Sequence, residues 1–548
     1  LVVEQRPVSV LYLSPIRALL NNQEERVSRY AGMIGRRAFK WHGDTAQSMR
    51  KRFLKDPTDV LLITPESLEA MLMSPRISAR ELFAGLRAVI IDEVHAFADD
   101  ARGAHLASLM ERLQRFCGRD LQRVGLSATV GNPEEILRWL QGSSQRPSRI
   151  VDPGGARRQP ELAIDYVGGL ENAATMIDKL HPGRKRLVFV DSRGQAERLG
   201  NLLSGLGVHT FVTHGSLSAR ERHDAERAFH QGSNCVIVAT SALELGIDVG
   251  DLDHVLQIDS PPSVASFLQR MGRTGRRGSP ANCTFLCTKE DSVLQAAAIL
   301  QLFRQGFVEP VRPVYRGYHI LAHQLMALCV QHSGVPIGDW WSWVAGAAPF
   351  TQVSGEERQA MVDHMLSTES LADQGGRLWL GPKGEKRYGG ANFRDLYAVF
   401  DSPRLITVRA GIDDIGQVDA MFLAAIDSEA QRGAFMLGGK SWQVATIDWE
   451  RGICIVRPAP QGRAPRWSGG ARFLGYDLCQ AMGTLLRSDV VDPSWSKRAT
   501  TVMETVRAEH ANLRDGIPFQ QTTDSITWWT FAGGEGPPGD GDGALGPT

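Results

Sequence analysis

Short apolar runs alternate with segments of helical spacing through the first half of the chain. The runs 8–13, 61–63, 88–91, 186–190 and 235–239 are each long enough for a buried strand, and each is followed by a polar turn. Continuous apolar runs of this length are typical of parallel strands that are covered by helices on both faces. The pattern therefore predicts an α/β protein built on parallel sheets.

The run 88–91 ends in two adjacent carboxylates, Asp92 and Glu93. Open α/β folds bind ligands at the carboxyl edge of the sheet, which is where a parallel strand presents such acids. There Asp92 can hold Mg²⁺ and Glu93 can orient a water molecule. A strand that simply ends in a solvated acidic turn is the alternative, and for an isolated Asp-Glu pair the two interpretations are equally good.

The pair is not isolated, because three further motifs follow it in order. They are Ser127-Ala128-Thr129, the segment 239–248, and the segment 269–276, which reads Gln-Arg-Met-Gly-Arg-Thr-Gly-Arg. Together with Asp92-Glu93-Val94-His95, this ordered set resembles the superfamily 2 helicases of the DExH type, and more closely the large helicase-related (Lhr) proteins. The resemblance runs from about residue 8 to about residue 500, and the ordered set is highly specific.

The resemblance implies two RecA-like parallel-sheet lobes followed by a winged-helix domain and a β-rich accessory domain. A polar stretch rich in Pro and Gly at 143–155 indicates the crossing between the lobes, and the composition changes after about residue 305. The expected domains are the first lobe at 1–150, the second lobe at 151–304, the winged helix at 305–395, the β-rich domain at 396–530 and a disordered tail at 531–548.

By the same resemblance, one group of residues binds ATP and Mg²⁺. Asp92 would hold the Mg²⁺ ion, Glu93 would polarise the attacking water, and His95 would link the γ-phosphate site to the second lobe. Arg273 and Arg276 are three residues apart, one helical turn, so both guanidinium groups can face the cleft and neutralise phosphate charge. The other nucleotide-binding candidates are Gln269, Gly246 and Asp248.

A second group is expected to contact nucleic acid. Arg17 is the candidate for a phosphate contact beside a helix N-terminus, although alone it would be an ordinary surface arginine after a strand. Ser127, Ala128 and Thr129 would couple the acids to this track. The other candidates are Pro15, His42, Gly43, Thr64, Pro65, Arg193, His214, Gly215, Thr240, Ser241, Arg466 and Trp467. For Arg466 and Trp467, which combine a phosphate donor with a stacking surface, a solvated basic loop is an equally good interpretation.

The segment after residue 305 predicts three helices and a hairpin that turns at Gly375-Gly376. Winged helices often bind DNA by their third helix, but here that helix carries Glu356, Glu357 and Asp363. Packing against the helicase lobes, with the hairpin or Trp340 and Trp343 touching a strand of nucleic acid, is at least as good an interpretation.

Composition limits the choice of partners only weakly. The 61 Lys and Arg residues balance the 61 Asp and Glu residues, so any basic track depends on local arrangement. The seven cysteines are scattered, which argues against a disulfide framework or a zinc site. The chain has no long apolar run and no signal peptide, so a cytoplasmic protein without a membrane partner is expected.

One family motif is absent from the sequence. No Gly-x-x-x-x-Gly-Lys-Ser/Thr segment precedes Asp92, and the nearest pattern, Gly433 with Gly439-Lys440-Ser441, has one intervening residue too many and lies far downstream. Two interpretations stay open. In the first, the chain starts one strand and helix late, as the first residue Leu1 allows. In the second, it is natively short and has lost catalysis.

The resemblance therefore implies an ATP-dependent helicase or translocase. It would move 3′ to 5′ on single-stranded DNA and unwind DNA or RNA:DNA duplexes, in DNA repair or defence. The alternative from another class is a non-catalytic nucleic-acid-binding protein derived from a helicase. A DNA translocase that remodels protein complexes without separating strands is the alternative within the enzyme class.

Overall fold

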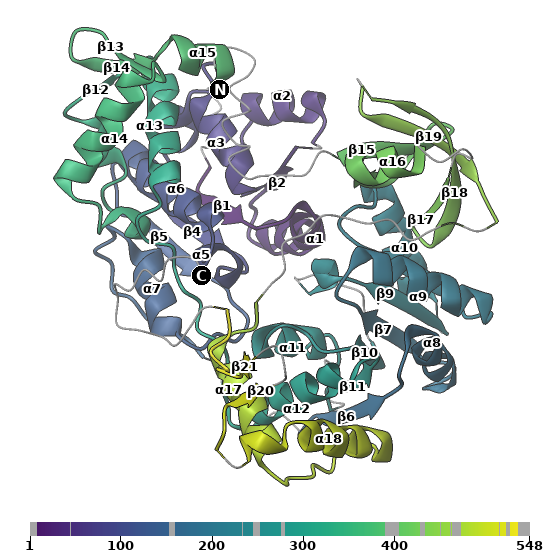
Figure 1. Cartoon of the computed structure of the whole chain (residues 1–548). Helices are drawn as coiled ribbons and strands as arrows, with labels where there is room; N and C mark the ends of the chain where they lie inside the picture. The colour runs from purple at the N-terminus through teal and green to yellow at the C-terminus, as the bar shows by residue number, and fades with distance from the viewer. Residues whose placement is uncertain are drawn as a thin grey trace. The chain divides into compact units, whose positions relative to one another are not determined.

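The computed structural model of the chain falls into two compact units, which we describe separately (Figure 1). The first unit comprises Leu1–Pro153 and Pro310–Asp401, and the second comprises Gly154–Glu309 and Ser402–Thr548. The structure describes residues 8–43, 45–152, 159–232, 234–244, 252–275, 280–388, 405–427, 433–449, 451–460, 462, 473–514, 516–521 and 526–534.

A parallel five-stranded sheet forms the centre of the first unit. Its strands are β1 (Val10–Leu13), β2 (Ala38–Trp41), β3 (Val60–Ile63), β4 (Ala88–Ile91) and β5 (Gln122–Gly125), in the order β2-β3-β1-β4-β5. The central strands are apolar because helices cover both faces, and Leu11, Leu61 and Val89 are fully buried. At the edge, β5 is less apolar, and Gln122 and Gly125 are exposed.

The structure describes seven α-helices around this sheet, and two of them begin at a side-chain N-terminal cap. The seven helices are α1 (Arg17–Met33), α2 (Gln47–Lys55), α3 (Pro65–Met73), α4 (Ala79–Leu82), α5 (His95–Ala98), α6 (Ala101–Cys117) and α7 (Pro133–Gln141). Thr64 caps α3, and Asp100 caps α6 by accepting hydrogen bonds from the backbone N–H groups of Arg102 and Gly103. Helix α6 ends at Gly118, whose φ of 59° lies in the left-handed region.

The predicted winged helix completes the first unit. It contains α13 (Tyr318–His332), β12 (Val335–Pro336), the 3₁₀ turns η2 (Trp340–Trp343) and η3 (Ala348–Phe350), α14 (Gly355–Ser367), β13 (Leu371–Asp373), β14 (Arg377–Leu380) and α15 (Pro382–Tyr388). The hairpin turns at Gly375 and Gly376, which both have positive φ. The side chains of α13 share one core with the lobe, which favours the packing interpretation, and Trp340 is buried in that core.

A buried polar network crosses from the lobe to the winged helix. Glu69 and Arg112 are fully buried, and Arg112 Nη1 lies 2.5 Å from Glu69 Oε1. Arg112 Nη1 also donates to Gln324 Oε1 of α13 at 2.9 Å, and His105 Nε2 lies 2.7 Å from Glu69 Oε2. The Arg112 guanidinium and His105 hold the pKa of Glu69 well below its ordinary value against the opposing effect of burial.

The second unit is built on a parallel six-stranded sheet. Its strands are β6 (Glu161–Tyr166), β7 (Lys185–Phe189), β8 (Thr210–Thr213), β9 (Cys235–Ala239), β10 (His254–Ile258) and β11 (Asn282–Cys287), in the order β6-β11-β10-β7-β9-β8. The helices are α8 (Leu170–Lys179), α9 (Arg193–Gly205), α10 (Ala219–Gln231), α11 (Val264–Met271) and α12 (Glu290–Arg304), with η1 (Ser241–Leu243) after β9. The two parallel sheets are the RecA-like lobes that were predicted.

A five-stranded, mostly antiparallel sheet follows in the same unit. It comprises β15 (Leu405–Ala410), β16 (Asp413–Asp419), β17 (Ala434–Leu437), β18 (Lys440–Asp448) and β19 (Ile453–Pro458), in the order β16-β15-β19-β18-β17, with helix α16 (Ala420–Asp427). Its core includes Ile406, Val418, Phe435 and Val444. The predicted fold class, two lobes with a winged helix and a β-rich part, is confirmed.

The end of the chain differs from the expectation that 396–530 forms one β-rich domain. Here lie α17 (Tyr476–Arg487), α18 (Lys497–Glu509), η5 (Ala511–Leu513), β20 (Phe519–Gln521) and β21 (Ile526–Trp528). Helices α17 and α18 pack against α12 of the second lobe. The backbone of Ile164 in β6 pairs with residues 494–496, so this segment protects the edge of the parallel sheet.

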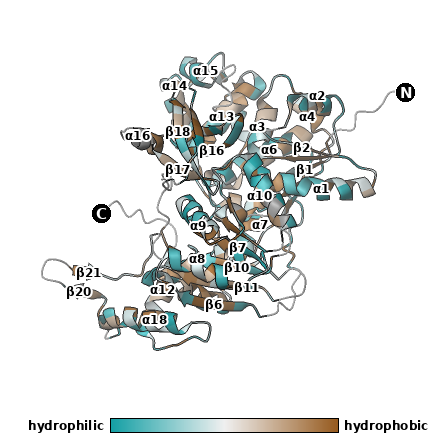
Figure 2. Cartoon of the chain, turned by 90° about the vertical axis from the view of Figure 1, so that its right-hand side faces the viewer, coloured by the Kyte–Doolittle hydropathy of each residue, from teal (hydrophilic) through white to brown (hydrophobic). Residues whose placement is uncertain are grey.

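Cys235, Cys283, Cys287, Cys329 and Cys454 are buried, and Cys117 and Cys479 are half-buried. Among the helices that the structure describes, none is both long and apolar enough to cross a bilayer. Figure 2 shows hydrophilic residues along the helices of both units.

The buried pair of Glu69 and Arg112 leads to a stability prediction. Replacing Arg112→Met leaves the Glu69 carboxylate buried without its guanidinium partner, which typically costs about 3–5 kcal/mol. We expect the chemical or thermal unfolding midpoint of the first unit to fall accordingly. The control is Arg37→Met, because Arg37 pairs with Asp56 on the surface and its loss should leave the midpoint unchanged. Equal effects of the two substitutions would contradict the account.

Candidate functional site

The predicted side chains of the first unit stand at the carboxyl ends of its parallel strands. His42 follows β2, Thr64 follows β3, Pro15 follows β1, Asp92 follows β4, and Ser127 follows β5. The order β2-β3-β1-β4-β5 therefore places the three candidate nucleic-acid loops side by side, with the acids next to them and the coupling motif beyond the acids. All of these groups share one edge of the sheet.

Two groups hold the carboxylate of Asp92, which is only 9% exposed. Tyr12 Oη donates to Oδ2 at 2.6 Å, and the backbone N–H of Glu93 donates to Oδ1 at 3.1 Å. Burial raises the pKa of Asp92 above its ordinary value, and the two hydrogen bonds oppose that rise. A cation beside this carboxylate would favour its ionised form.

Glu93 and His95 form the turn from β4 into α5. Glu93 has a φ of 50°, a left-handed conformation that is strained for a residue other than glycine. His95 Nδ1 lies 3.0 Å from Ser127 Oγ and 3.6 Å from Glu93 Oε2. Burial lowers the pKa of His95 to about 4, so the imidazole is neutral at physiological pH. The imidazole ring therefore lies between Glu93 and Ser127. Thr129, the last residue of the coupling motif, is exposed.

The acids fit a magnesium ion that arrives with a nucleotide. Mg²⁺ is commonly held by one or two carboxylates together with water and substrate phosphates. Among the described residues, no group of three or more His, Cys, Asp or Glu is arranged to hold a metal ion. Asp92 therefore suits Mg²⁺ that is shared with phosphate oxygens better than a structural metal enclosed by protein ligands.

The loops after β1 and β2 form one cationic surface. Arg17 is exposed at the start of α1, and a Cβ atom added to Gly43 would lie 2.9 Å from Arg17 Nη2. Glycine at position 43 therefore permits this close approach. Arg50 Nη2 donates to the carbonyl oxygens of His42 and Gly43, each at 2.8 Å. The His42 ring is buried and lies 3.1 Å from Asn21 Oδ1, so it supports α1.

Arg102 connects the loops after β1 and β3. Its Nε and Nη2 atoms donate to Glu66 Oε1 at 2.9 and 2.7 Å, and Nη2 also donates to the carbonyl oxygen of Pro15 at 2.7 Å. Thr64 is 6% exposed and caps α3, and Pro65 is buried as the first residue of that helix. The side chain of Thr64 is thus engaged in the turn, and the helix N-terminus beside it is the part that can face a phosphate.

Strand ends in the second unit bring together the loops that carry Arg193, Gly215 and Ser241. They follow β7, β8 and β9, which are neighbours in the sheet. Arg193 Nη1 donates to Ser216 Oγ at 2.8 Å. Gly215 and Ser241 are exposed, whereas Thr240 is 8% exposed. These loops therefore offer an arginine, a hydroxyl group and exposed backbone to a ligand.

His214 does not face outward in this group. Its side chain is fully buried, and Nε2 lies 2.8 Å from Glu197 Oε1 of helix α9. The structure therefore places the imidazole beneath the loop and leaves the neighbouring Gly215 on its surface. The sequence alone does not reveal this, because the partner acid lies seventeen residues earlier on another element.

The arginine-rich motif after α11 includes a buried ion-pair network. Arg270 Nε donates to Glu244 Oε1 at 2.7 Å, and Nη1 donates to Gln257 Oε1 at 2.5 Å. Arg273 is 9% exposed, and its Nη2 donates to the Glu244 carbonyl oxygen. Burial raises the pKa of Asp191 to about 6, although Arg270 at 3.5 Å opposes this rise. Arg270, the first arginine of the motif, is thus a buried residue that orients Glu244, Gln257 and Asp191.

Gln269, one residue earlier on α11, is half-buried. Five predicted site residues lie outside the described residues, and their roles stay predictions. They are Gly246, Asp248, Arg276, Arg466 and Trp467.

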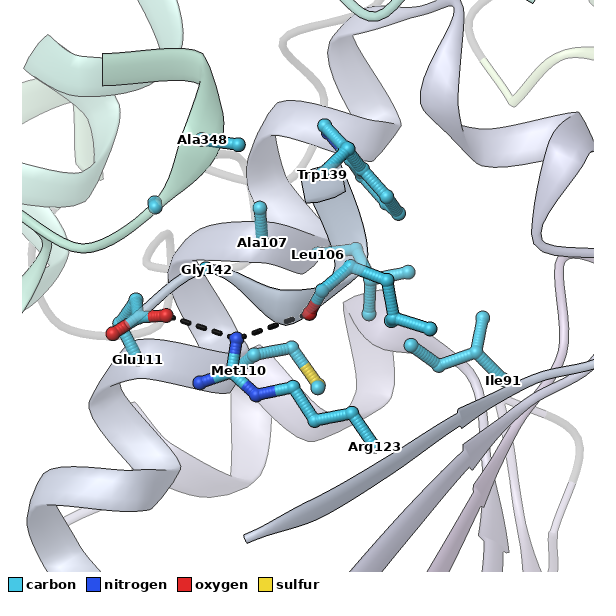
Figure 3. Close-up of a pocket in the computed structure, with 11 residues that line it drawn as sticks. Ile91, Leu106, Ala107, Met110, Glu111, Arg123, Trp139, Gly142 and Ala348 are labelled. Atoms are coloured by element: carbon cyan, nitrogen blue, oxygen red, sulfur yellow. Dashed lines mark hydrogen bonds and ion pairs between the residues drawn. The ribbon is translucent and has the colours of Figure 1, made fainter. Parts of the chain in front are cut away.

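The pocket drawn in Figure 3 lies elsewhere in the first unit. Its lining includes Leu106, Trp139 and Leu140, together with an ion pair in which Arg123 Nη1 is 3.0 Å from Glu111 Oε1. None of the predicted site residues lines it. The predicted site residues therefore lie at the strand ends and not at this pocket.

Sequence reasoning missed the residues that support the site. Tyr12, Arg50, Arg102, Glu197 and Arg270 each bind a candidate residue or its loop. Arg270 stands inside a recognised motif and Tyr12 carries a hydroxyl into an otherwise apolar run, so these two gave a weak signal. The other three gave none, because no local pattern marks the groups with which Arg50, Arg102 and Glu197 pair.

Two family descriptions match the chain. Residues 2–136 match the DEAD/DEAH box helicases, and residues 170–278 match the helicase conserved C-terminal domain. These matches fall on the two parallel-sheet lobes, whose strand ends carry the acids and the arginines. The fold and the site therefore define a superfamily 2 helicase.

Comparison with curated relatives identifies the family within the superfamily 2 helicases. The chain is 30% identical over 86% of its length to an Lhr helicase/probable uracil glycosylase of Mycolicibacterium smegmatis, and 27% identical over 86% to the ATP-dependent helicase Lhr-Core of Methanothermobacter thermautotrophicus. A solved structure of Mycobacterium smegmatis helicase Lhr bound to ssDNA and AMP-PNP matches 93% of this chain and 67% of that one, with 28% identity and a TM-score of 0.70. This chain belongs to the Lhr-like family. It spans 36% and 58% of the lengths of the two curated relatives.

The burial of His95 leads to a pH prediction. An unfolded histidine takes up its proton near pH 6.5, whereas folded His95 does so only near pH 4, so acid favours the unfolded state. The stability due to neutral His95 is therefore complete above about pH 6.5 and is lost as the pH falls toward 4. In a histidine NMR titration, the resonance that disappears in His95→Asn should have a midpoint near 4. A midpoint near 6.5 would contradict the buried, neutral ring.

Proposed function

We propose that this chain is the core of an ATP-dependent motor that binds single-stranded nucleic acid. One observation carries the proposal: His95 Nδ1 lies 3.0 Å from Ser127 Oγ and 3.6 Å from Glu93 Oε2, at the same sheet edge that carries Arg17 and Gly43. A nucleotide-dependent change at the acids can therefore reach the nucleic-acid loops through adjacent strand ends.

In this proposal each side chain has a defined task. Asp92 holds the Mg²⁺ ion, and Glu93 orients a water molecule and accepts its proton on a carboxylate oxygen. Neutral His95 couples a displacement of Glu93 to Ser127. Arg273 and Arg276 neutralise the negative charge of the nucleotide phosphates. Bound ATP with Mg²⁺ would supply the phosphoryl transfer whose free energy drives movement.

The nucleic acid and the direction of movement are finer parts of the proposal. Single-stranded DNA is the first ligand to test, because the solved Lhr relative was described bound to ssDNA. Movement from 3′ to 5′, the unwinding of DNA or RNA:DNA duplexes and a role in repair or defence rest on the family resemblance. The proposed domain limits are those expected from the sequence, except that α17 and α18 are assigned to the second lobe because they pack on α12.

A non-catalytic nucleic-acid-binding protein is the second candidate. The printed residues before Asp92 contain no Gly-x-x-x-x-Gly-Lys-Ser/Thr segment, and this candidate describes a protein that has none. Backbone amides of such a segment normally cradle the nucleotide phosphates. Hydrolysis is therefore best measured on this chain and on a form that includes any residues its gene encodes upstream.

The first test is ATP hydrolysis with and without single-stranded DNA. We expect DNA-stimulated hydrolysis that Glu93→Gln reduces by about 10²- to 10⁴-fold, because general-base catalysis contributes a factor of this size. Nucleotide affinity should persist in Glu93→Gln, because Asp92 still holds the metal ion. The matched control is Glu171→Gln, an exposed acid on α8 whose loss should not alter turnover.

The outcomes separate the two candidates. Turnover that needs Glu93 supports the motor. If neither form of the protein hydrolyses ATP while both bind single-stranded DNA, the motor proposal fails and the binding protein remains.

The cationic surface leads to a binding prediction. Replacing Arg17→Ala should weaken the affinity for single-stranded DNA and reduce the slope of log affinity against log salt concentration by about 1, because one phosphate contact is lost. The control is Arg29→Ala, which removes an exposed arginine from the other end of α1. Titrations at several salt concentrations would measure both quantities, and identical slopes for the two variants would exclude the assigned contact.

A further inference from the structure

A single buried carboxylate joins helix α9, the loop after β8 and the β-rich sheet. The Glu197 side chain is fully buried, and its Oε1 lies 2.8 Å from His214 Nε2. The backbone N–H of Gly438 donates to Oε1 at 2.5 Å, and that of Gly439 donates to Oε2 at 2.7 Å. All three partners are potential donors, so the carboxylate is satisfied from two separate segments of the chain.

The two glycines form the tight turn between β17 and β18. Their φ values of 67° and 71° lie in the left-handed region, so that consecutive N–H groups can point at one acceptor. The same residues belong to the segment that comes close to the phosphate-binding pattern in the sequence. In the structure the backbone N–H groups of Gly438 and Gly439 donate to the Glu197 carboxylate. This contact explains the two glycines, and no bound nucleotide is needed to explain them.

Strand β16 holds the same loop from another side. The backbone N–H of Gln417 donates to the Ser216 carbonyl oxygen at 2.6 Å, and that of Ser218 donates to the Ile415 carbonyl oxygen at 2.9 Å. A Cβ atom added to Gly416 would lie 2.3 Å from the Ser216 oxygen, so glycine is required for this approach.

Leu217 extends this attachment into the core of the β-rich sheet. It is 4% exposed and packs in the same cluster as Ile406, Val408 and Phe435. A leucine of the loop after β8 is therefore a core residue of the neighbouring sheet. The loop conformation and the folding of the sheet depend on each other.

The supported loop is one of the candidate nucleic-acid contacts. Arg193 and Glu197 stand four residues apart on α9, and Arg193 Nη1 bonds Ser216 while Glu197 bonds His214. One face of α9 thus holds both ends of the segment 214–216. A displacement of the β-rich sheet would therefore also displace Gly215 and Arg193.

We propose that Glu197 is a positioning residue that ties the β17–β18 turn to the loop 214–218 and so sets the nucleic-acid contact of the second lobe. The inference rests on the proposed function. His214 acts through Glu197 in this scheme and touches no ligand itself. The β-rich sheet is then a fixed support for the loop.

Glu197→Gln tests the role with little change in volume. The amide keeps one acceptor but turns an NH₂ donor toward N–H groups, so the loop should lose its alignment. We expect about tenfold weaker binding of a single-stranded oligonucleotide, as for a lost charged hydrogen bond. The slope of log affinity against log salt should fall by about 1, because Arg193 is displaced from its phosphate.

The matched control is Asp413→Asn. Asp413 of β16 pairs with Arg220 of α10 on the surface, so it also joins the β-rich sheet to the lobe but does not reach the loop. Its affinity and salt slope should equal those of the parent protein. Combining Glu197→Gln with Arg193→Ala should weaken binding no further than Arg193→Ala alone, because both changes remove one contact.

A second variant disturbs the same loop from another element. Gly416→Ala pushes on the Ser216 carbonyl from β16 and leaves Glu197 unchanged, and it should reproduce the loss of affinity and slope. Both variants are compared by circular dichroism and by thermal unfolding, in which a native spectrum is expected. If both fold and bind the oligonucleotide as the control does, or if the effects of Glu197→Gln and Arg193→Ala simply add, the positioning role is overturned. If the parent itself fails to bind the oligonucleotide, the proposed function falls, and this inference falls with it.

Discussion

The site depends on one geometrical constraint, the shared direction of the strands in each parallel sheet. Parallel strands deliver all their carboxyl ends to one edge, and the order β2-β3-β1-β4-β5 sets which groups become neighbours there. The loop that leads to Arg17 ends up beside Asp92, and Asp92 ends up beside Ser127. Tyr12 and Asp92, which are 80 positions apart in the sequence, thus meet without any side chain having to span the lobe.

Buried acids hold these edges in shape. Glu69 joins α3 and α6 of the first lobe to the winged helix, and Glu197 joins α9 of the second lobe to the β-rich sheet. In both cases a carboxylate with no exposure is satisfied by several donors from different elements. A partly satisfied network of this kind is costly, so each acid makes one arrangement of the neighbouring part much more favourable than others. The accessory parts of both units are therefore integral to the lobes.

The sequence predicted what depends on local pattern. Apolar runs that end in polar turns located the strands, and the ordered motifs indicated Asp92, Glu93 and Arg273, whose roles stay predictions. Contacts between distant segments escaped prediction. The burial of His214 depends on Glu197, and the placement of α17 and α18 on the second lobe depends on the open edge of β6 and the apolar face of α12. No local periodicity encodes such partners, because hydrophobic spacing specifies that a face is covered and not by what.

The most direct test of the motor account is the thermodynamic coupling between nucleotide and nucleic acid. The affinity for single-stranded DNA should be measured on the longest native form of the polypeptide, with and without a non-hydrolysable ATP analogue and Mg²⁺. The account predicts that the analogue changes DNA affinity at least about fivefold, that DNA changes analogue affinity by the same factor, and that Ser127→Ala diminishes both. Two ligands that bind with unchanged affinities would contradict the account.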